Sequence, residues 1–345
     1  MAHRSTKVKN MAASIQARLK GLADKSGQNF DELLLLYTLE GVLRRLTQSK
    51  HRDHFVLKGG LLLFGMRANL SRSTRDLDLL GRHTSVDPAN VAALIREICE
   101  QPLLEDDGLR FDPESVETKV ITEETEYPGV RTLLYGYLDR ARSRVVIDIG
   151  AGDPIVPGPQ AFAYPTLLGQ QPFTLQAYSV ESVIAEKLHA LAERGLLSSR
   201  LKDCYDLWAL AQQHAFEGAL LQQAIQATFA ARGRAFEPEL PTILTPAFAE
   251  DAQKQRQWAA FIAAKSAESA PTTLAEALAP ATRLLAPLWQ ASQARQPFSG
   301  LWDTAAGEWR DAPPDTTAAP DEAPSAAASA EPSPIENPAP DTQSC

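Results

Sequence analysis

The stretch FVLKGGLLLFGMRANLSRSTRDLDLLG, residues 55–81, decides the fold expected for this chain. Two adjacent glycines, Gly59 and Gly60, precede a short apolar segment, and Asp76 and Asp78 then open a second apolar segment. A buried strand avoids carboxylates, because an unpaired buried charge is costly. The two aspartates therefore lie either on a solvated edge or beside something cationic.

Asp76 and Asp78 are two residues apart on an expected strand, 76–80, so their side chains point to the same face. Like charges at this spacing repel one another unless they share a cation. A third carboxylate, Asp148, stands between apolar neighbours on a later expected strand, 144–149. Three carboxylates on neighbouring strands suit one or two Mg²⁺ ions, which take their other ligands from water and substrate phosphates.

Gly59 and Gly60 lead into an expected short helix, 61–67. Glycine lets the backbone approach a ligand closely, and a helix N-terminus offers free N–H groups to a phosphate. A pair of glycines is weak support by itself, because turn glycines are far commoner. The order of two glycines, short helix, D-x-D and later strand aspartate is much more specific.

The wider pattern predicts an α+β protein. Residues 1–175 mix helical and β-rich segments, which indicates a small mixed-sheet α/β domain with N-terminal helices. Residues 176–310 carry apolar residues at helical spacing, which predicts a helical domain. The segments QQPFTLQA and EPELPTILTP are expected to be linkers. The last segment, 311–345, is rich in Pro, Ala, Ser and acids, and is expected to be a disordered tail because it cannot bury enough apolar area.

Periodicity and turn residues predict the individual elements. Asp87 and Pro88 fit the cap and first position of one helix. Helices are expected over 11–25, 30–49, 61–67, 87–101, 179–194, 201–213, 218–232, 247–264 and 273–292. Extended segments are expected over 56–57, 76–80, 109–121 (interrupted by a proline), 130–138 and 144–149.

Composition predicts a cytoplasmic protein without a membrane partner. No apolar run approaches the roughly 20 residues of a membrane helix, and the first ten residues lack the apolar core of a signal peptide. Three widely spaced cysteines argue against a disulfide framework.

The net charge of −9 is concentrated at one end of the chain. Residues 311–345 hold seven acids and no Lys or Arg, which leaves 36 acids against 34 bases elsewhere. The first 52 residues carry ten Lys or Arg against four acids, and further arginines surround the D-x-D segment. An anionic partner would need such a region, although a solvated basic face fits the charge equally well.

Two motifs resemble the AbiEii/AbiGii toxin-like branch of the polymerase-β-type nucleotidyltransferase superfamily. The first is K-G-G, an apolar helix, then R-x-T-x-D-[LIV]-D. The second, VESVIAEKLHALAERGLLSSRLKDCYDLWAL, resembles that branch's E-K-[LF]-x-A-L-x-x-R followed by K/R-D-x-Y-D-L. The resemblance spans roughly residues 30–215. Many nucleotidyltransferases have a serine after the first glycine, whereas this sequence has Gly60, so only backbone donors remain there. In this sequence the residues that match the first motif are Lys58, Gly59, Gly60, Arg72, Thr74, Asp76 and Asp78.

The second motif brings basic and acidic residues onto two helices. Lys187 and Arg194 are seven residues apart, so they share a helix face and are placed to grip a triphosphate. Asp203 and Asp206 share a face of the next helix. The resemblance assigns Lys187 and Asp203 to the catalytic site, with Arg194 and Asp206 as weaker candidates. The alternative is a pair of interhelix salt bridges, Lys187 to Asp203 or Arg194 to Asp206.

The resemblance implies a Mg²⁺-dependent nucleotidyltransferase that moves a nucleoside monophosphate from an NTP to an acceptor hydroxyl, with a two-metal site. It also implies the toxin of a bacterial toxin–antitoxin or phage-defence system, a cognate antitoxin, and RNA, in particular the tRNA 3′ end, as acceptor. The implied metal ligands are Asp76, Asp78 and Asp148, and the implied nucleotide-binding residues are Gly59, Gly60, Arg72, Thr74, Lys187 and Arg194.

Two alternatives stay open at this stage. One is an enzyme of the same fold that modifies a small molecule or a protein hydroxyl. The other is a non-catalytic binding protein. The intact set of three carboxylates argues against the second, because a pure binder has no reason to hold three like charges together.

Overall fold

The structure is a computed structural model that describes residues 10–67, 74–121, 129–263 and 271–311. These residues belong to one compact unit that ends at Asp311. They form helices together with a mixed sheet, which confirms the predicted α+β class. The segment predicted to be a tail lies outside the described residues, except for Asp311 itself.

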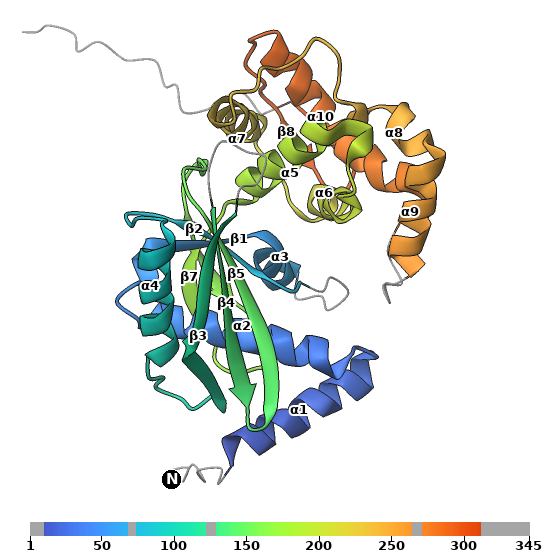
Figure 1. Cartoon of the computed structure of the whole chain (residues 1–345). Coiled ribbons are helices and arrows are strands. Elements are labelled where there is room, and N and C mark those ends of the chain that lie inside the picture. The colour runs from blue at the N-terminus through green and yellow to red at the C-terminus, as the bar shows by residue number, and fades with distance from the viewer. Residues whose placement is uncertain (1–9, 68–73, 122–128, 264–270, 312–345) are drawn as a thin grey trace, which may run out of the picture. The chain divides into compact units, whose positions relative to one another are not determined.

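Seven strands form the main β-sheet. They are β1 Phe55–Lys58, β2 Leu77–Gly81, β3 Leu109–Ile121, β4 Gly129–Leu138, β5 Ala141–Gly150, β6 Gln160–Tyr164 and β7 Phe173–Ala177. Their order across the sheet is β3-β4-β5-β2-β1-β7-β6, and Figure 1 labels β3, β4 and β5 at the front of the sheet. β2 runs parallel to β5 and β1 runs parallel to β7, and the other neighbours are antiparallel. The aspartates of β2 and β5 are thereby placed on adjacent central strands.

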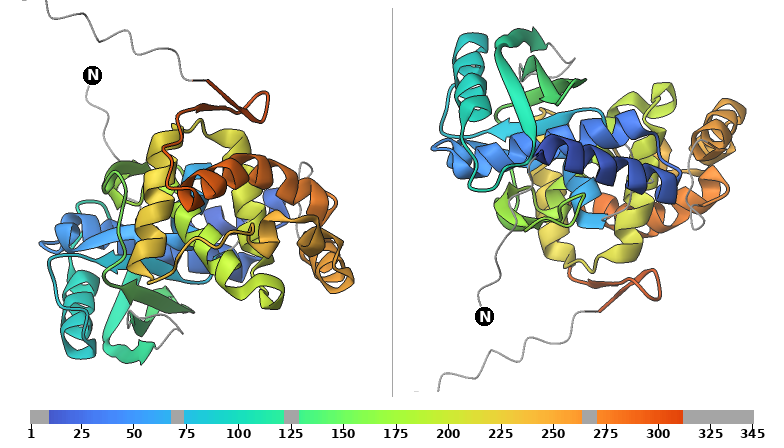
Figure 2. Two further views of the ribbon diagram at one scale, coloured as in Figure 1. Left: turned by 90° about the horizontal axis from the view of Figure 1, so that it is seen from above. Right: turned by 90° about the horizontal axis from the view of Figure 1, so that it is seen from below.

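The helices divide into those that cover the sheet and those that pack with one another. They are α1 Met11–Ser26, α2 Phe30–Gln48, α3 Gly59–Arg67, α4 Pro88–Glu100, α5 Val180–Arg194, α6 Leu201–Gln213, α7 Gly218–Ala231, α8 Pro246–Glu250, α9 Ala252–Ala263 and α10 Leu274–Gln293, with short 3₁₀ turns η1 Arg52–His54, η2 Gly195–Leu197 and η3 Thr242–Leu244. α2 contacts β5 and β7, α4 packs on β3 and β4, and α1 lies against α2 (Figure 2). From α5 onward the helices pack together, α5 against α7 and α6 against α10.

The two faces of the central strands differ in polarity. Leu77 and Leu79 of β2 and Ile147 and Ile149 of β5 are buried. The residues between them alternate to the other face of the pleated sheet and are half-exposed. The apolar face packs against helices such as α2, so the opposite face is left for the carboxylates.

Most predicted elements appear in the structure within three residues of their expected ends. Asp87 caps α4 by accepting from the backbone N–H groups of Ala89 and Asn90, with proline at the start of the helix. The predicted helix 247–264 is instead two helices, α8 and α9. The break falls at Asp251, whose carboxylate accepts from the N–H of Lys254 at 2.8 Å and so starts a new helix.

The prediction that QQPFTLQA is a linker was wrong. Phe173–Ala177 is strand β7, and Ala177 pairs with Leu57 of β1. The expected boundary at residue 175 therefore falls inside a strand of the sheet. Phe173, Leu175 and Ala177 alternate as a strand requires, but the run is short and follows a proline. β6 was not predicted, nor was the small hairpin β8 Leu301–Asp303 with β9 Glu308–Arg310.

Candidate active site

Three carboxylates gather where β2 meets β5. Asp78 and Asp148 are direct neighbours in the parallel register of these strands, and Asp76 lies one residue before β2. One oxygen from each of Asp76, Asp78 and Asp148 lies within 4.8 Å of the other two. The structure therefore brings together the three residues selected from the sequence, and their oxygens are the donor type that Mg²⁺ prefers.

Gly59 owes its identity to the position of Asp78. Its φ is +67°, and a Cβ at this residue would lie 1.9 Å from Asp78 Oδ2. The backbone N–H of Gly60 donates to the same oxygen at 3.2 Å. The two glycines thus let the start of α3 lie directly against Asp78. The N–H of Gly60, which was expected to bind a phosphate, donates instead to a carboxylate of the site.

Asp76 and Asp78 have different surroundings. Burial, reinforced by the charge of Asp76, raises the pKa of Asp78 to about 6. The buried hydroxyl of Thr74 donates to Asp76 Oδ1 at 3.0 Å and fixes its orientation. A cation bound between these carboxylates would offset both the burial and the repulsion, so the site fits a divalent metal.

Two basic residues flank the carboxylates on the neighbouring strands. Lys58 of β1 lies opposite Asp78 of β2, and Arg131 of β4 lies opposite Asp148 of β5. The Arg131 guanidinium binds Asp148 in a fork, with Nε 2.7 Å from Oδ1 and Nη2 2.6 Å from Oδ2. The three aspartates are therefore partly neutralised by the protein itself.

Lys58 belongs to an ion-pair network that joins the sheet to the helices. Its Nζ lies 2.8 Å from Asp153, in the loop after β5, and 3.1 Å from Glu186 of α5. Asp153 also accepts from Arg232, just after α7, at 2.7 Å. Burial opposes the charge of Lys58, but the charges of Glu186 and Asp153 outweigh it and hold the Lys58 pKa well above its usual value. The network fixes α5 and α7 beside the carboxylates.

α5 and α6 bring Lys187 between two aspartates. Its Nζ lies 2.6 Å from Asp203 Oδ1 and 2.8 Å from Asp206 Oδ2. The side chains of Asp203 and Asp206 are 6% and 0% exposed. Arg200 adds a longer contact of 3.6 Å to Asp203. The ion pair considered as the structural alternative is present, and it also fixes the direction in which the ammonium points.

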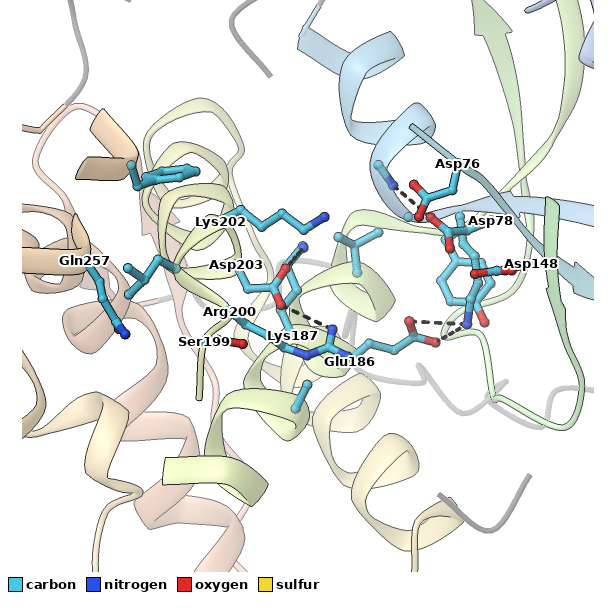
Figure 3. A pocket seen from close by; sticks show the side chains of 18 of the residues that line it. Asp76, Asp78, Asp148, Glu186, Lys187, Ser199, Arg200, Lys202, Asp203 and Gln257 are labelled. Atoms are coloured by element: carbon cyan, nitrogen blue, oxygen red, sulfur yellow. Dashed lines mark hydrogen bonds and ion pairs between the residues drawn. The ribbon is translucent and has the colours of Figure 1, made fainter. Parts of the chain in front are cut away.

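One cavity of about 960 Å³ separates these two groups (Figure 3). The three aspartates lie on its sheet wall, and Arg200, Lys202 and Asp203 of the α6 region lie across the gap, with Glu186 and Lys187 of α5. Beyond them α9 contributes Gln257, Ala260 and Phe261. A smaller cavity of about 90 Å³ shares Lys58, Asp78 and Asp148 with the large one.

The other residues selected from the sequence fall in different places. Gly59, Gly60 and Lys187 line the large cavity. Thr74 supports Asp76 and is not part of the cavity wall. Arg194 is exposed in the last turn of α5 and does not line the cavity. Arg72 lies outside the described residues.

Sequence reasoning missed Arg131, Glu186 and Lys202. Arg131 lies on β4, the strand directly before the one that carries Asp148, and the register of β4 on β5 is needed to place it beside that aspartate. Glu186 and Lys202 are the E and the K/R of the second motif, so the motif itself offered a signal for both, although neither received a role from it.

A family model described as nucleotidyl transferase AbiEii toxin, type IV toxin–antitoxin system, matches residues 41–280. That range covers more than half of the 345 residues and contains both motifs as well as the cavity. The chain belongs to the AbiEii family. The resemblance inferred from the sequence is thereby confirmed.

AbiEii membership makes the chain a nucleotidyltransferase of a type IV toxin–antitoxin system. An enzyme of this class has a nucleotide substrate, and a system of this type has an antitoxin partner. Within the described ranges, no helix has the length and apolar character needed to cross a bilayer.

Solved structures similar to this AbiEii chain share 14% identity with it. A protein provisionally named as a nucleotidyltransferase from H. pylori has a TM-score of 0.44 and covers 76% of this chain and 96% of its own. JHP933 from Helicobacter pylori has a TM-score of 0.42, with 75% and 91% covered. An antigenic nucleotidyltransferase-like protein from Paracoccidioides brasiliensis has a TM-score of 0.27, with 74% and 88% covered. Comparison with curated proteins gave no match.

Proposed function

We propose that this AbiEii chain transfers a nucleoside monophosphate from a Mg²⁺-bound NTP to a hydroxyl of RNA, with the tRNA 3′ end as acceptor, and that this reaction is its toxic activity. One observation carries the proposal: three clustered carboxylates on the sheet face the basic side chains of α5 and α6 across a single cavity. Such an arrangement suits a substrate that binds metal at one end and carries several phosphates.

Asp76, Asp78 and Asp148 would hold the metal. Bound Mg²⁺ would supply charge neutralisation and keep the attacking and leaving oxygens in line. Gly60 N–H and the Thr74 hydroxyl keep two of these carboxylates in fixed orientations. Asp148, on the neighbouring strand, would also accept the proton of the acceptor hydroxyl.

The triphosphate would lie along the α5 and α6 wall. Asp203 and Asp206 hold Lys187 in one position, so its charge is in place before the substrate arrives. Lys202 is exposed on the same wall, and its amine points across the gap toward the carboxylates (Figure 3). Fixed cations of this kind stabilise the charge that develops on the leaving pyrophosphate without reorganising.

The cavity is large enough for both substrates of the proposed reaction. A volume of about 960 Å³ lies at the upper end for small-molecule sites, which leaves room for an acceptor end beside the nucleotide. The smaller cavity of about 90 Å³ adjoins the same two carboxylates, Asp78 and Asp148.

The decisive experiment is transfer of label from each α-labelled NTP to total tRNA in the presence of Mg²⁺. One NTP is expected to label tRNA with the intact enzyme, while Asp78→Asn should give no label and Arg144→Gln, a surface variant outside the cavity, should keep it. RNA contacts should also make the reaction sensitive to salt. Label on a protein or small molecule with none on tRNA would show that the acceptor is wrong, and no labelled product from any acceptor would contradict the reaction.

A further inference from the structure

Four charged residues form a continuous row across four neighbouring strands. The registers pair Lys58 with Asp78, Asp78 with Asp148, and Asp148 with Arg131, on β1, β2, β5 and β4 in turn. Directly opposed residues share a face of the sheet. The row therefore reads cation, carboxylate, carboxylate, cation, with the expected metal ligands in its middle.

The two ends of the row differ in their exposure and in the carboxylates that they contact. The Lys58 side chain is 17% exposed and is held by two carboxylates, Asp153 and Glu186. The Arg131 side chain is 40% exposed, and its ion pair is with Asp148, itself a candidate metal ligand. A change in the charge of Asp148 would act directly on Arg131, because the guanidinium binds both oxygens of that carboxylate.

A metal ion bound to Asp148 would meet oxygens that Arg131 already contacts. Both oxygens of Asp148 accept hydrogen bonds from the Arg131 fork, at 2.7 and 2.6 Å. Mg²⁺ requires near-ideal octahedral geometry and cannot share a crowded carboxylate freely. Two cations on one carboxylate also repel each other.

We propose that Arg131 is a positioning residue that neutralises Asp148 until the metal binds, and that the guanidinium then turns to a phosphate of the substrate. The inference rests on the proposed metal-dependent transfer. A planar guanidinium matches two phosphate oxygens as well as it matches a carboxylate. Arg131 lines the cavity and is partly exposed, so a phosphate entering with the metal lies within its reach. Metal binding and phosphate binding are coupled through this single side chain.

The first test is calorimetric titration of the full chain with Mn²⁺, which avoids any need for turnover. Arg131→Gln is expected to bind Mn²⁺ about tenfold more tightly than the unchanged protein, because a hydrogen-bonded charge no longer has to be displaced. Arg144→Gln makes the same change of charge at an exposed position of β5 outside the cavity. It should change the affinity less than about twofold at 0.15 M salt, where screening is strong.

A double-mutant cycle separates competition for Asp148 from a general charge effect. In an Asp148→Asn background, Arg131→Gln should no longer tighten Mn²⁺ binding. A persisting gain there would show that Arg131 acts only through its long-range field and would overturn the proposal.

The second test is binding of a non-hydrolysable NTP analogue at saturating Mn²⁺. Arg131→Gln should weaken this binding about tenfold, opposite in sign to its effect on the metal, and Arg131→Lys should restore part of it. Unchanged nucleotide affinity would overturn the second half of the proposal. If all variants bind Mn²⁺ equally, the proposed role of Arg131 is refuted but the metal site is not. If the unchanged protein does not bind Mn²⁺, the metal site of the proposed function is refuted as well.

Discussion

Gly59→Ala is expected to damage the site and the fold by two separable effects. Gly59 has a φ of +67°, a conformation that alanine adopts only with strain. The new Cβ would also lie 1.9, 2.4 and 2.6 Å from three side-chain atoms of Asp78. Contacts this short cannot persist, so Asp78 has to turn away from α3.

The structure offers Gly169 as a matched reference. Its φ is also +67°, but a Cβ there would meet nothing within 4 Å. Both substitutions cost about 1–2 kcal/mol of backbone strain, and both change the entropy of the unfolded chain equally. Only Gly59→Ala breaks the hydrogen bond from Gly60 to Asp78, which as a bond to a charged group contributes about 1.5–3 kcal/mol. Gly59→Ala should therefore be less stable than Gly169→Ala by that amount.

Denaturant unfolding of the two variants measures the difference, and Mn²⁺ titration measures the site. Gly169→Ala should bind Mn²⁺ as the unchanged protein does, whereas Gly59→Ala should bind it at least tenfold more weakly because Asp78 has moved. Equal stability of the two variants together with normal Mn²⁺ binding by Gly59→Ala would refute the reasoning, since the collision with Asp78 would then have no consequence.

Asp78→Asn is expected to abolish transfer while leaving the metal-free protein at least as stable, because burial and the adjacent Asp76 disfavour the charged form of Asp78. Label transfer measures the first effect and unfolding in EDTA measures the second. An active variant would contradict the assignment of Asp78 as a metal ligand. Lys187→Met should cost about 3–5 kcal/mol of unfolding free energy, because it removes the ammonium that lies closest to the buried Asp203 and Asp206. Lys187→Arg keeps the charge and should fold but transfer poorly, so normal transfer by either variant would make this lysine structural. His189 is buried, and that burial lowers its pKa from 6.5 to about 4. As the pH falls from about 6.5 to 4, the imidazole is protonated in the unfolded chain before it is protonated in the folded protein, so stability is lost. The free energy of unfolding of the unchanged protein, relative to that of His189→Gln, should fall by up to about 3 kcal/mol over this range. A difference that does not depend on pH would contradict a buried neutral imidazole.

The carboxylate cluster could be predicted because strand geometry is simple. A spacing of two places Asp76 and Asp78 on one face wherever the strand lies, and a carboxylate between apolar residues marks Asp148 as unusual. Adjacency of β2 and β5 was the only further requirement, and the structure meets it. Helix ends could also be predicted, because a cap such as Asp87 bonds to backbone N–H groups no more than three residues away.

Long-range partners could not be predicted from the sequence in the same way. Arg131 meets Asp148 only through the register of two strands, and Lys58 meets Glu186 across 128 positions of chain. Strand β7 was not predicted, because its five residues have no strong local pattern and are stabilised by pairing with β1. The predicted roles of Thr74 and Arg194 in nucleotide binding are not supported by their positions, one behind Asp76 and the other outside the cavity.

The charge of the cavity explains how an acidic chain accepts a polyanion. Among the described residues, six Lys or Arg and five Asp or Glu line it, so its wall carries a single net positive charge although the whole chain carries −9. That near balance lets the carboxylates approach one another without a metal, since Arg131 and Lys58 stand at either end of the row. Each divalent ion held by the three aspartates would add two positive charges. The cavity would then be strongly cationic only with metal bound, so metal and nucleotide should each tighten the binding of the other. A nucleotide without metal would meet a wall that is almost neutral, and the enzyme would select the metal-bound form of its substrate by charge alone.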